Sequence, residues 1–339
     1  MNARTIAVDI GSGYSKYLFV PESGEISDMQ KAIKSFRTAV GPYRAATLQP
    51  GVKPLIVEFE DHSFYVGATA EVALSPEQRT NTLSSQWAFE DGHRALVYYI
   101  LARALIGEGI EPSETPIPLR FITGLPQAYY EGGAEKLRNA YSGVHRFRHD
   151  GKQWLINLVD VQVVPQAMGA GYMAMETHLS ESEAAERVGI IDIGTYTSDF
   201  CLSEDVQYHA YESGGVPIGV SSLLKVLKSI LERDLGHNYT DESLRKAFER
   251  KNVLVRSQTV DITPQIEEAI SQVGRSLQKS LPSSWDTNTM YLVLAGGGGA
   301  PYFFGDFFKA AYPHIKVVAT PENAIVMGYA IYGAARALE

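Results

Sequence analysis

The chain has 339 residues, of which 45% are hydrophobic and 20% charged, a composition that excludes a disordered or low-complexity protein. The net charge of −9 argues against direct binding of nucleic acid, which needs clustered lysines and arginines. The single cysteine, Cys201, excludes an internal disulfide framework. No apolar run approaches the ~20 residues of a membrane span, and no signal peptide precedes the first predicted strand. We therefore expect a cytoplasmic protein of about two domains, with no membrane contact.

Residues 6–20 predict a strand, a tight turn and a second strand. Apolar β-formers flank Gly11-Ser12-Gly13, in which glycine permits the positive φ of a tight turn. Asp9 ends the first strand, so its carboxylate is expected to point into the cleft that the turn faces. Turns of this kind present several backbone N–H groups in one direction, as phosphate-binding loops do. Glycine and aspartate also occur in hairpins for geometric reasons alone, so one such turn is not specific.

The following elements alternate between strands and helices. The pattern predicts a hairpin over residues 57–66, a helix over 90–106, and a strand over 119–122 that ends in a turn at 123–126. After a helix over 131–140, a second hairpin covers 144–164 and turns at Asp150-Gly151. Pro165 ends its last strand, and Gln166 begins a helix of small residues.

The second half of the chain repeats the first motif. Residues 188–202 again read as strand, Asp-Ile-Gly, small hydroxyl residues and strand. A loop is predicted at 214–219, and a buried strand over 290–295 runs into four glycines, where close approach of a ligand is expected. The other predicted elements are helices over 221–235, 241–251, 263–281 and 321–338, and a strand over 315–318. Two copies of one motif predict two related halves that offer their hairpins to a shared cleft.

Several familiar alternatives do not fit these motifs. A Rossmann site needs a helix after its glycines, whereas strands follow both turns here, and no Walker A sequence occurs. His145 and His149 lie in a predicted hairpin, where their spacing does not make a metal site. The basic cluster Arg245, Lys246, Arg250 and Lys251 is interpreted as a solvated helix face, with a filament contact as the second alternative.

Five motifs, in order, resemble those of the actin-like ATPase superfamily. They are DIGSGYSKY and DIGTYTSDF (two phosphate loops), VVPQAMGAG and PENAIVMGYAIYG (two connecting helices) and LVLAGGGGAPY (the adenosine loop). Further stretches, ITGLPQAYY and ESGGVPIGVSSLLKVL, are similar to plasmid-segregation actins of the ParM/StbA type. The resemblance implies an α/β, duplicated actin-like (ribonuclease H-like) fold with two domains around a central nucleotide cleft. Domain I is expected over 1–165 with the C-terminal helix 321–339, and domain II over 166–320.

The resemblance also implies roles for particular residues. Asp9 and Asp192 are expected to orient Mg²⁺ through its waters, since Mg²⁺ keeps several waters and uses few carboxylates. Gln166 corresponds to the residue that positions the attacking water, where many ParM-like proteins carry Glu. Lys16 is placed to neutralise phosphate charge, although a solvated lysine fits its position equally well. The remaining nucleotide-binding residues are Gly11, Ser12, Gly13, Gly194, Thr195 and Thr197 for the phosphates, and Gly296, Gly297 and Gly298 for the adenosine.

The implied function is a filament-forming ATPase that binds and hydrolyses Mg-ATP, or GTP, and drives plasmid DNA segregation. Its expected partners are further copies of itself and a DNA-binding adaptor protein, because the acidic chain is not expected to hold DNA directly. Two alternatives remain open: a small-molecule, sugar-kinase-like phosphotransferase, for which no carboxylate base can be nominated, and a non-polymerising ATP-dependent switch.

Overall fold

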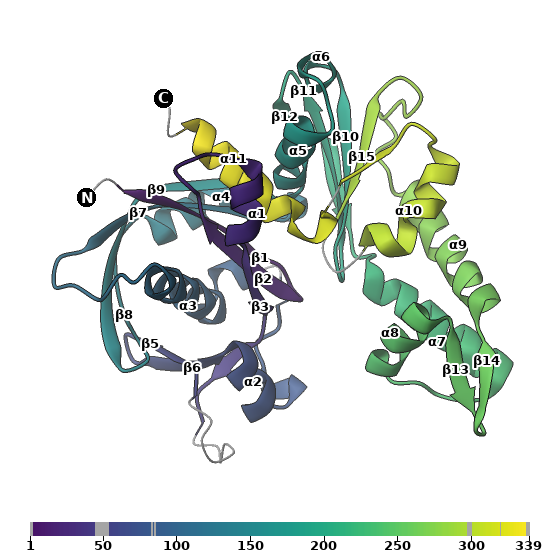
Figure 1. Cartoon of the computed structure of the whole chain (residues 1–339), viewed down its shortest axis with the longest axis horizontal. Helices are drawn as coiled ribbons and strands as arrows, with labels where there is room; N and C mark the ends of the chain where they lie inside the picture. The colour runs from purple at the N-terminus through teal and green to yellow at the C-terminus, as the bar shows by residue number, and fades with distance from the viewer. Residues whose placement is uncertain are drawn as a thin grey trace. The chain divides into compact units, whose positions relative to one another are not determined.

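The structure is a computed structural model that describes residues 3–44, 54–82, 84, 86–296, 300–318 and 320–336. The chain forms two compact units (Figure 1). Unit 1 comprises Met1–Ala174 and Asn323–Glu339, and unit 2 comprises Met175–Glu322. Within the described residues, helices that are both long and apolar enough to cross a bilayer are absent.

Unit 1 is built on a nine-stranded sheet with the order β3-β2-β1-β7-β9-β8-β5-β6-β4. Strands β1, β7 and β9 run parallel to one another, whereas β2 is antiparallel to β1 and β3 is antiparallel to β2. The strands are β1 (Arg4–Ile10), β2 (Tyr14–Phe19), β3 (Lys34–Arg37), β4 (Val40–Pro42), β5 (Ile56–Phe59), β6 (His62–Val66), β7 (Ile117–Leu125), β8 (Gly143–His149) and β9 (Lys152–Pro165).

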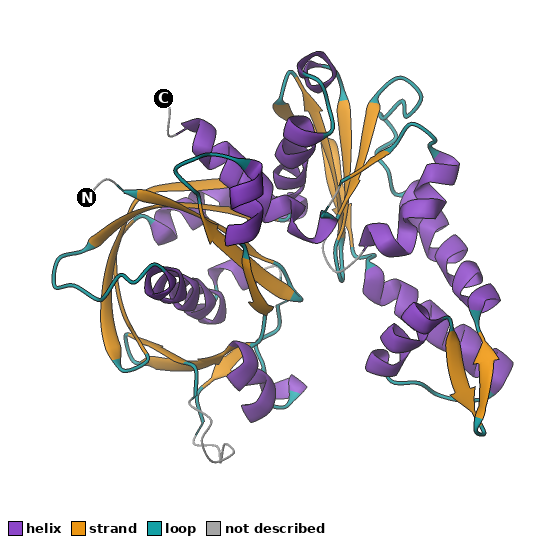
Figure 2. Ribbon diagram, in the orientation of Figure 1, coloured by secondary structure: helices purple, strands orange, loops and turns teal. Residues whose placement is uncertain are grey.

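The sheet of unit 1 curves around helix α3 (Asp91–Gly107), as Figure 2 shows. Every residue from 95 to 102 on this helix is buried, which is the pattern of a helix with apolar neighbours on all sides. The edge strands β3 and β4 are consecutive in the chain and separated only by Thr38 and Ala39. The sheet therefore nearly closes on itself, and α3 fills its interior.

The other helices of unit 1 include two that approach each other at backbone distance, α5 (Gln166–Thr177) and α11 (Ala324–Arg336). A Cβ added to Gly328 of α11 would lie 1.6 Å from the carbonyl oxygen of Gly169 on α5. The rings of Tyr172 and Tyr332 stack beside this crossing, with centroids 5.4 Å apart. The remaining helical segments of unit 1 are α1 (Ile26–Ala32), α2 (Gly67–Ala73), η1 (Pro76–Gln78), η2 (Trp87–Phe89) and α4 (Gln127–Tyr141). The short 3-10 turn η3 (Pro321–Asn323) leads from unit 2 into α11.

Unit 2 contains a five-stranded sheet with the order β12-β11-β10-β15-β16 and a separate hairpin, β13–β14. Its strands are β10 (Val188–Ile193), β11 (Ser198–Glu204), β12 (Gln207–Val216), β13 (Asn252–Val255), β14 (Gln258–Asp261), β15 (Tyr291–Ala295) and β16 (Lys316–Val317). Its helices are α6 (Glu181–Ala185), α7 (Val220–Leu235), α8 (Asp241–Arg250), α9 (Thr263–Lys279) and α10 (Ala300–Ala311). The predicted apolar stripe of α7 is buried, and Gly236 ends that helix in the left-handed conformation.

The two sheets share one strand pattern. Read from β3, the first five strands of unit 1 are β3-β2-β1-β7-β9, and each has a counterpart in β12-β11-β10-β15-β16. In both sheets an antiparallel hairpin supplies the central strand, and two strands parallel to it follow. The α/β fold and the internal duplication predicted from the repeated motif are confirmed.

Some predicted elements are wrong in their extent. Residues 123–125 do not form a turn, because β7 continues to Leu125 and Gly124 packs against the Tyr329 hydroxyl. Gly214 and Gly215 do not lie in a loop, because they pair with β11 as part of β12. The hairpin β13–β14 and the helix α10 have no counterpart among the predicted elements.

The close approach of α5 and α11 predicts that position 328 does not tolerate a side chain larger than that of glycine. Gly328→Ala places a methyl group inside van der Waals distance of the Gly169 backbone, so we expect the free energy of unfolding to fall by about 1–3 kcal/mol or more. Gly132→Ala is the matched control, because Gly132 is also helical and nothing lies within 4 Å of an added Cβ. Its expected effect is a gain of about 0.5–1 kcal/mol. Chemical denaturation measures both, and equal stabilities for the two variants would contradict the crossing.

Candidate functional site

The sequence-predicted residues of unit 1 meet at the carboxyl ends of its parallel strands. Asp9 is the penultimate residue of β1, and Gln166 directly follows β9 as the first residue of α5. Because β1, β7 and β9 are parallel, their carboxyl ends lie at the same edge of the sheet. The Gln166 Nε2 group accordingly donates a hydrogen bond of 3.2 Å to Asp9 Oδ1, across 157 residues of sequence.

Lys16 completes this cluster from the second strand of the hairpin. It is the cross-strand partner of Asp9, and its Nζ lies 3.8 Å from Asp9 Oδ2. Both side chains are buried, so Lys16 is not a solvated surface lysine. Burial raises the pKa of Asp9 above its usual value, and the charge of Lys16 and the hydrogen bond from Gln166 offset part of that rise. Unit 1 therefore holds one buried acidic and one buried basic side chain beside its turn.

The turn between β1 and β2 is fixed through its carbonyl groups. The Thr38 hydroxyl donates to the Gly11 carbonyl at 2.6 Å, and the Thr38 N–H donates to the Gly13 carbonyl at 3.1 Å. The Thr82 hydroxyl reaches the Ser12 carbonyl at 3.4 Å. Gly11 itself is required, because an added Cβ would lie 2.9 Å from the Tyr14 carbonyl oxygen. Thr38 was not singled out from the sequence, where no motif marks it.

The corresponding position in unit 2 carries two acidic side chains. Asp192 on β10 and Asp199 on β11 are cross-strand partners, as Asp9 and Lys16 are in unit 1, and both are buried. Cross-strand neighbours of this kind have Cβ atoms ~5 Å apart. Asp199 was missed in the sequence, although the signal was present: seven positions separate the two charged residues in each motif. Two carboxylates at one position favour a bound cation more than a carboxylate beside an ammonium does.

The turn after β10 is also held through its carbonyl groups. Gly194 donates its N–H to the Thr197 carbonyl at 2.8 Å, while its own carbonyl accepts from the Val220 N–H at 3.1 Å. The Thr195 carbonyl accepts from the Ser221 N–H at 2.8 Å, so the first turn of α7 braces the loop. The Thr197 side chain is exposed. Residue 219 must be glycine here, because a Cβ would lie 2.7 Å from the Gly194 carbonyl oxygen.

Gly296 directly follows β15 and lies beside Ile193, the last residue of β10. Its φ of 141° lies in a region that favours glycine, and an added Cβ would lie 2.2 Å from the Ile193 carbonyl oxygen. The close contact with the Ile193 backbone explains the glycine at 296, whereas the close approach of a ligand expected from the glycine run stays a prediction. Gly297 and Gly298, which were predicted to contact adenosine, lie outside the described residues.

The described residues hold no group of three or more His, Cys, Asp or Glu side chains arranged around a metal position. The structure instead gathers Asp9, Lys16 and Gln166 at one edge in unit 1. In unit 2 it gathers Asp192, Asp199 and Gly296 at the equivalent edge. Each edge thus combines a braced turn with buried charge, an aspartate and a lysine in unit 1 and two aspartates in unit 2.

Comparisons with known proteins agree with this geometry. Residues 7–169 match the family model for the N-terminal domain of actin-like proteins, and residues 190–309 match the model for the C-terminal domain of the archaeal, MreB-like actin homologue. A search of curated proteins found no match.

Solved structures resemble the chain over nearly its whole length. The archaeal actin homologue Ta0583 shares 19% identity with a TM-score of 0.75, covering 98% of this chain and 99% of that one. A ParM from a 15-stranded filament of Clostridium botulinum shares 17% identity with a TM-score of 0.69, over 98% of this chain and 99% of that one. Bacillus thuringiensis ParM with ATP shares 16% identity with a TM-score of 0.70, over 100% of both chains. At these identities the likeness shows the fold.

The contact at Gly296 yields a test of the site's construction. Gly296→Ala forces a side chain into a left-handed conformation against the Ile193 carbonyl, and we expect a loss of about 1–3 kcal/mol or more in the free energy of unfolding. Gly305→Ala on α10 is the control, because an added Cβ meets nothing within 4 Å there. The control should gain about 0.5–1 kcal/mol. Denaturation without nucleotide measures both, and an unchanged Gly296→Ala protein would refute the described geometry.

Proposed function

Because this chain is an actin-like protein in both of its halves, we propose that it binds and hydrolyses Mg-ATP and forms filaments when ATP is bound. One observation carries the proposal. A braced turn beside a buried charged pair occurs twice, at the same register position of two sheets with the same strand order. A single such turn is a common feature of hairpins, whereas two turns at equivalent positions, one near Gln166 and the other near Gly296, support binding of a ligand with several phosphate groups.

The two turns are assigned to the phosphates. The carbonyl groups of residues 11–13 accept hydrogen bonds from Thr38 and Thr82. The N–H groups of the same turn are therefore proposed to donate to a bound anion. Lys16 adds a positive charge beside them. In unit 2 the same role falls to the turn of Gly194, Thr195 and Thr197. The two threonine hydroxyl groups add donors there, since the Gly194 N–H already donates to the Thr197 carbonyl. Each turn is proposed to bind nucleotide phosphates.

The acidic residues fit Mg²⁺ bound through water. Mg²⁺ keeps several of its waters and needs one or two carboxylates, and the repeat supplies Asp9 from one unit and Asp192, with Asp199, from the other. Bound Mg²⁺ neutralises charge on the β- and γ-phosphates. A buried carboxylate whose pKa is raised by desolvation, as that of Asp9 is, gains more from a nearby cation than an exposed one does.

Gln166 is proposed to orient the attacking water. Its Nε2 group is held by Asp9, so its side-chain oxygen remains to accept a hydrogen bond from a water. A neutral amide acts by holding the water in position and does not remove its proton. The identity of the residue at 166 thus sets how the water is held, and Asp9 is the group that sets the amide's orientation.

Nucleotide state is proposed to control assembly. Each charge-assisted hydrogen bond to the γ-phosphate contributes about 1.5–3 kcal/mol. Losing two on hydrolysis shifts a two-state equilibrium by about a hundredfold or more, enough to change filament growth into disassembly. The acidic chain is further proposed to move plasmid DNA through a separate DNA-binding adaptor.

The rate of phosphate release by an Asp192 variant tests whether Asp192 belongs to the nucleotide site. Asp192→Ala removes a buried carboxylate assigned to Mg²⁺ coordination, so we expect phosphate release to fall by about 100-fold or more, the loss typical of a key electrostatic group. Asp306→Ala is the control, because Asp306 is an exposed acid of the same unit on α10. Phosphate release is measured for both after circular dichroism has shown that they are folded. Unchanged hydrolysis in Asp192→Ala would mean that the site is misplaced.

Assembly is tested by its dependence on protein concentration. With Mg-ATP we expect light scattering to appear above a threshold concentration, and phosphate release per molecule to rise at the same threshold. Addition of EDTA should remove both. A release rate per molecule that stays flat, or that rises only when a sugar is added, would contradict a filament-forming ATPase and favour a small-molecule kinase.

A further inference from the structure

Thr38 contacts the turn between β1 and β2 through two of its own groups. Its hydroxyl donates to the Gly11 carbonyl at 2.6 Å, and its N–H donates to the Gly13 carbonyl at 3.1 Å. Thr38 lies in the two-residue link between β3 and β4, and its side chain is buried. Hydrogen bonds are electrostatically stronger in such an interior than in water. One residue therefore holds two of the three carbonyl groups of this turn.

A second buried hydroxyl lies behind that of Thr38. The side-chain oxygens of Ser15 and Thr38 are 2.9 Å apart. A threonine hydroxyl has one hydrogen, and Thr38 already donates that hydrogen to the Gly11 carbonyl. Ser15 is therefore the donor to Thr38, and the chain of hydrogen bonds runs in one direction, from Ser15 through Thr38 to Gly11. Hydrogen bonds in such a chain polarise and strengthen one another.

The chain ends on a peptide unit that carries an N–H group on its other side. The Gly11 carbonyl and the Ser12 N–H belong to one planar, trans peptide unit and point in opposite directions. A hydrogen bond to the carbonyl therefore fixes the direction of the N–H group and increases its polarity. Successive backbone N–H groups held in a turn form concavities that bind anions. The Ser12 N–H is directed away from Thr38, on the side of the peptide unit that is open to a phosphate donor contact.

The internal duplication of the chain gives Thr38 a counterpart in unit 2. Ser15 and Ser198 occupy equivalent positions, each opposite the last residue of the central strand. Two residues beyond the partner of each serine on the third strand lie Thr38 and Ile218, respectively. The same two positions are in contact in both units, because the Ser198 hydroxyl donates to the Ile218 carbonyl at 2.7 Å.

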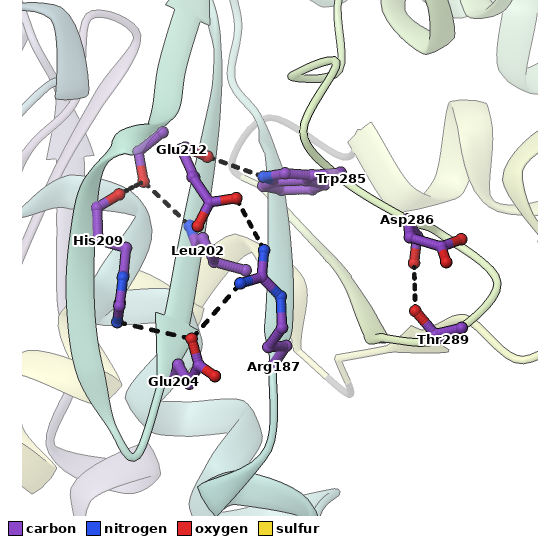
Figure 3. Close-up of polar contacts among 9 residues, drawn as sticks. Arg187, Leu202, Glu204, His209, Glu212, Trp285, Asp286 and Thr289 are labelled. Carbon is purple, nitrogen blue, oxygen red and sulfur yellow. Dashed lines mark hydrogen bonds and ion pairs between the residues drawn. The ribbon is translucent and has the colours of Figure 1, made fainter.

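The irregular part of β12 does not affect this equivalence. The register between β11 and β12 shifts after Phe200, further from the turn. Figure 3 shows the polar contacts that hold the shifted part, including the hydrogen bond from the Trp285 indole N–H to the Glu212 carbonyl at 2.7 Å. Ser198 lies on the turn side of the shift, where the pairing is regular. The count of residues that equates positions 38 and 218 therefore does not cross the bulge.

The two units differ in the group that holds the first carbonyl of the turn. Ile218 has no hydroxyl, and in unit 2 the Gly194 carbonyl accepts from the N–H of Val220 in the first turn of α7. A backbone N–H at the start of a helix is present whatever the side chain of that residue is. In unit 1 a side-chain hydroxyl makes the equivalent hydrogen bond, so the geometry of that turn depends on the identity of residue 38.

We propose that Thr38, with Ser15 behind it, is a positioning residue that fixes and polarises the Ser12 N–H for a hydrogen bond to a nucleotide phosphate. This role rests on the nucleotide binding proposed above and names the side chains on which the unit 1 turn depends. Neither hydroxyl has to touch the nucleotide, because both act through the peptide unit of residues 11 and 12. Loss of the Thr38 hydroxyl should therefore weaken phosphate binding although it removes no contact with the ligand.

Removal of the Thr38 hydroxyl tests this role. Thr38→Val keeps the shape of the side chain and the N–H bond to Gly13, but leaves the Gly11 carbonyl without its hydroxyl donor. We expect the dissociation constant of Mg-ATP to rise about tenfold. Thr38→Ser keeps the hydroxyl and should bind Mg-ATP within about threefold of the wild type. Calorimetry below the threshold concentration for assembly measures each constant, and circular dichroism establishes that each variant is folded.

The matched control is Thr69→Val, the same substitution at another buried threonine of unit 1. The Thr69 hydroxyl accepts from the Leu55 N–H at 2.9 Å, a hydrogen bond that does not involve the turn. We expect both valine variants to be less stable to denaturant than the wild type, because each loses a buried hydrogen bond. Only Thr38→Val should bind Mg-ATP more weakly, and the constant for Thr69→Val should change by less than about twofold.

A double substitution tests whether Ser15 acts through Thr38. Ser15→Ala alone removes the first donor of the chain and should raise the dissociation constant about threefold. In a Thr38→Val background the same change should alter the constant by less than about twofold, because the chain is already broken. Two independent structural effects would instead multiply.

The outcomes separate this role from the nucleotide binding on which it rests. Wild-type protein that does not bind Mg-ATP removes both. Wild-type protein that binds, while Thr38→Val binds equally well, overturns the positioning role alone. Equal losses in Thr38→Val and Thr38→Ser, or in Thr38→Val and Thr69→Val, also overturn it, because the Thr38 hydroxyl is then not the cause. If Thr38→Val does not fold, Ser15→Ala decides, and an affinity equal to that of the wild type overturns the role.

Discussion

The cross-strand pairing beside each turn is the constraint on which the rest of the structure depends. In both units an acidic residue sits one position before the end of the central strand, and the hairpin register places a second charged residue opposite it. Register in a sheet is all-or-none, because a slip of one residue would turn both side chains to the other face. The parallel strands beside the hairpin then bring Gln166 in unit 1 and Gly296 in unit 2 to the same edge. A few backbone hydrogen bonds thus position side chains that are up to 157 residues apart.

The two copies have diverged in charge while keeping their geometry. Unit 1 opposes its aspartate with Lys16, and unit 2 opposes its aspartate with Asp199. An aspartate beside a lysine is a neutral pair, whereas two aspartates together favour a bound cation. Each turn is braced by residues from a different element, Thr38 in one case and the start of α7 in the other. The turns are therefore shaped before any ligand arrives, which lowers the cost of binding.

The sequence predicted what is repeated or strongly periodic. Both hairpins, the apolar stripe of α7 and the turn at Asp150-Gly151, where both residues have positive φ, follow from local chemistry. The strand β12 was not predicted, because Gly214 and Gly215 read as a loop and the bulge breaks its alternation. Helix α10, which begins directly after the glycine run, was not predicted either. Within the site, Asp9, Lys16 and Gln166 were identified by motif order. Thr38 and Gly219 required the three-dimensional contacts, since each acts on the backbone of a residue distant in sequence.

The order of the two units along the chain affects when each unit is complete during synthesis. Unit 2 is a continuous segment, whereas unit 1 needs both its first 174 residues and the last stretch, because α11 packs on β1. The strands that surround α3 are also split, with β1–β6 emerging before the helix and β7–β9 after it. During translation the surface of β1 that α11 covers consequently stays exposed until that helix has been synthesised. All residues of unit 2 are therefore synthesised before the residues of unit 1 are complete.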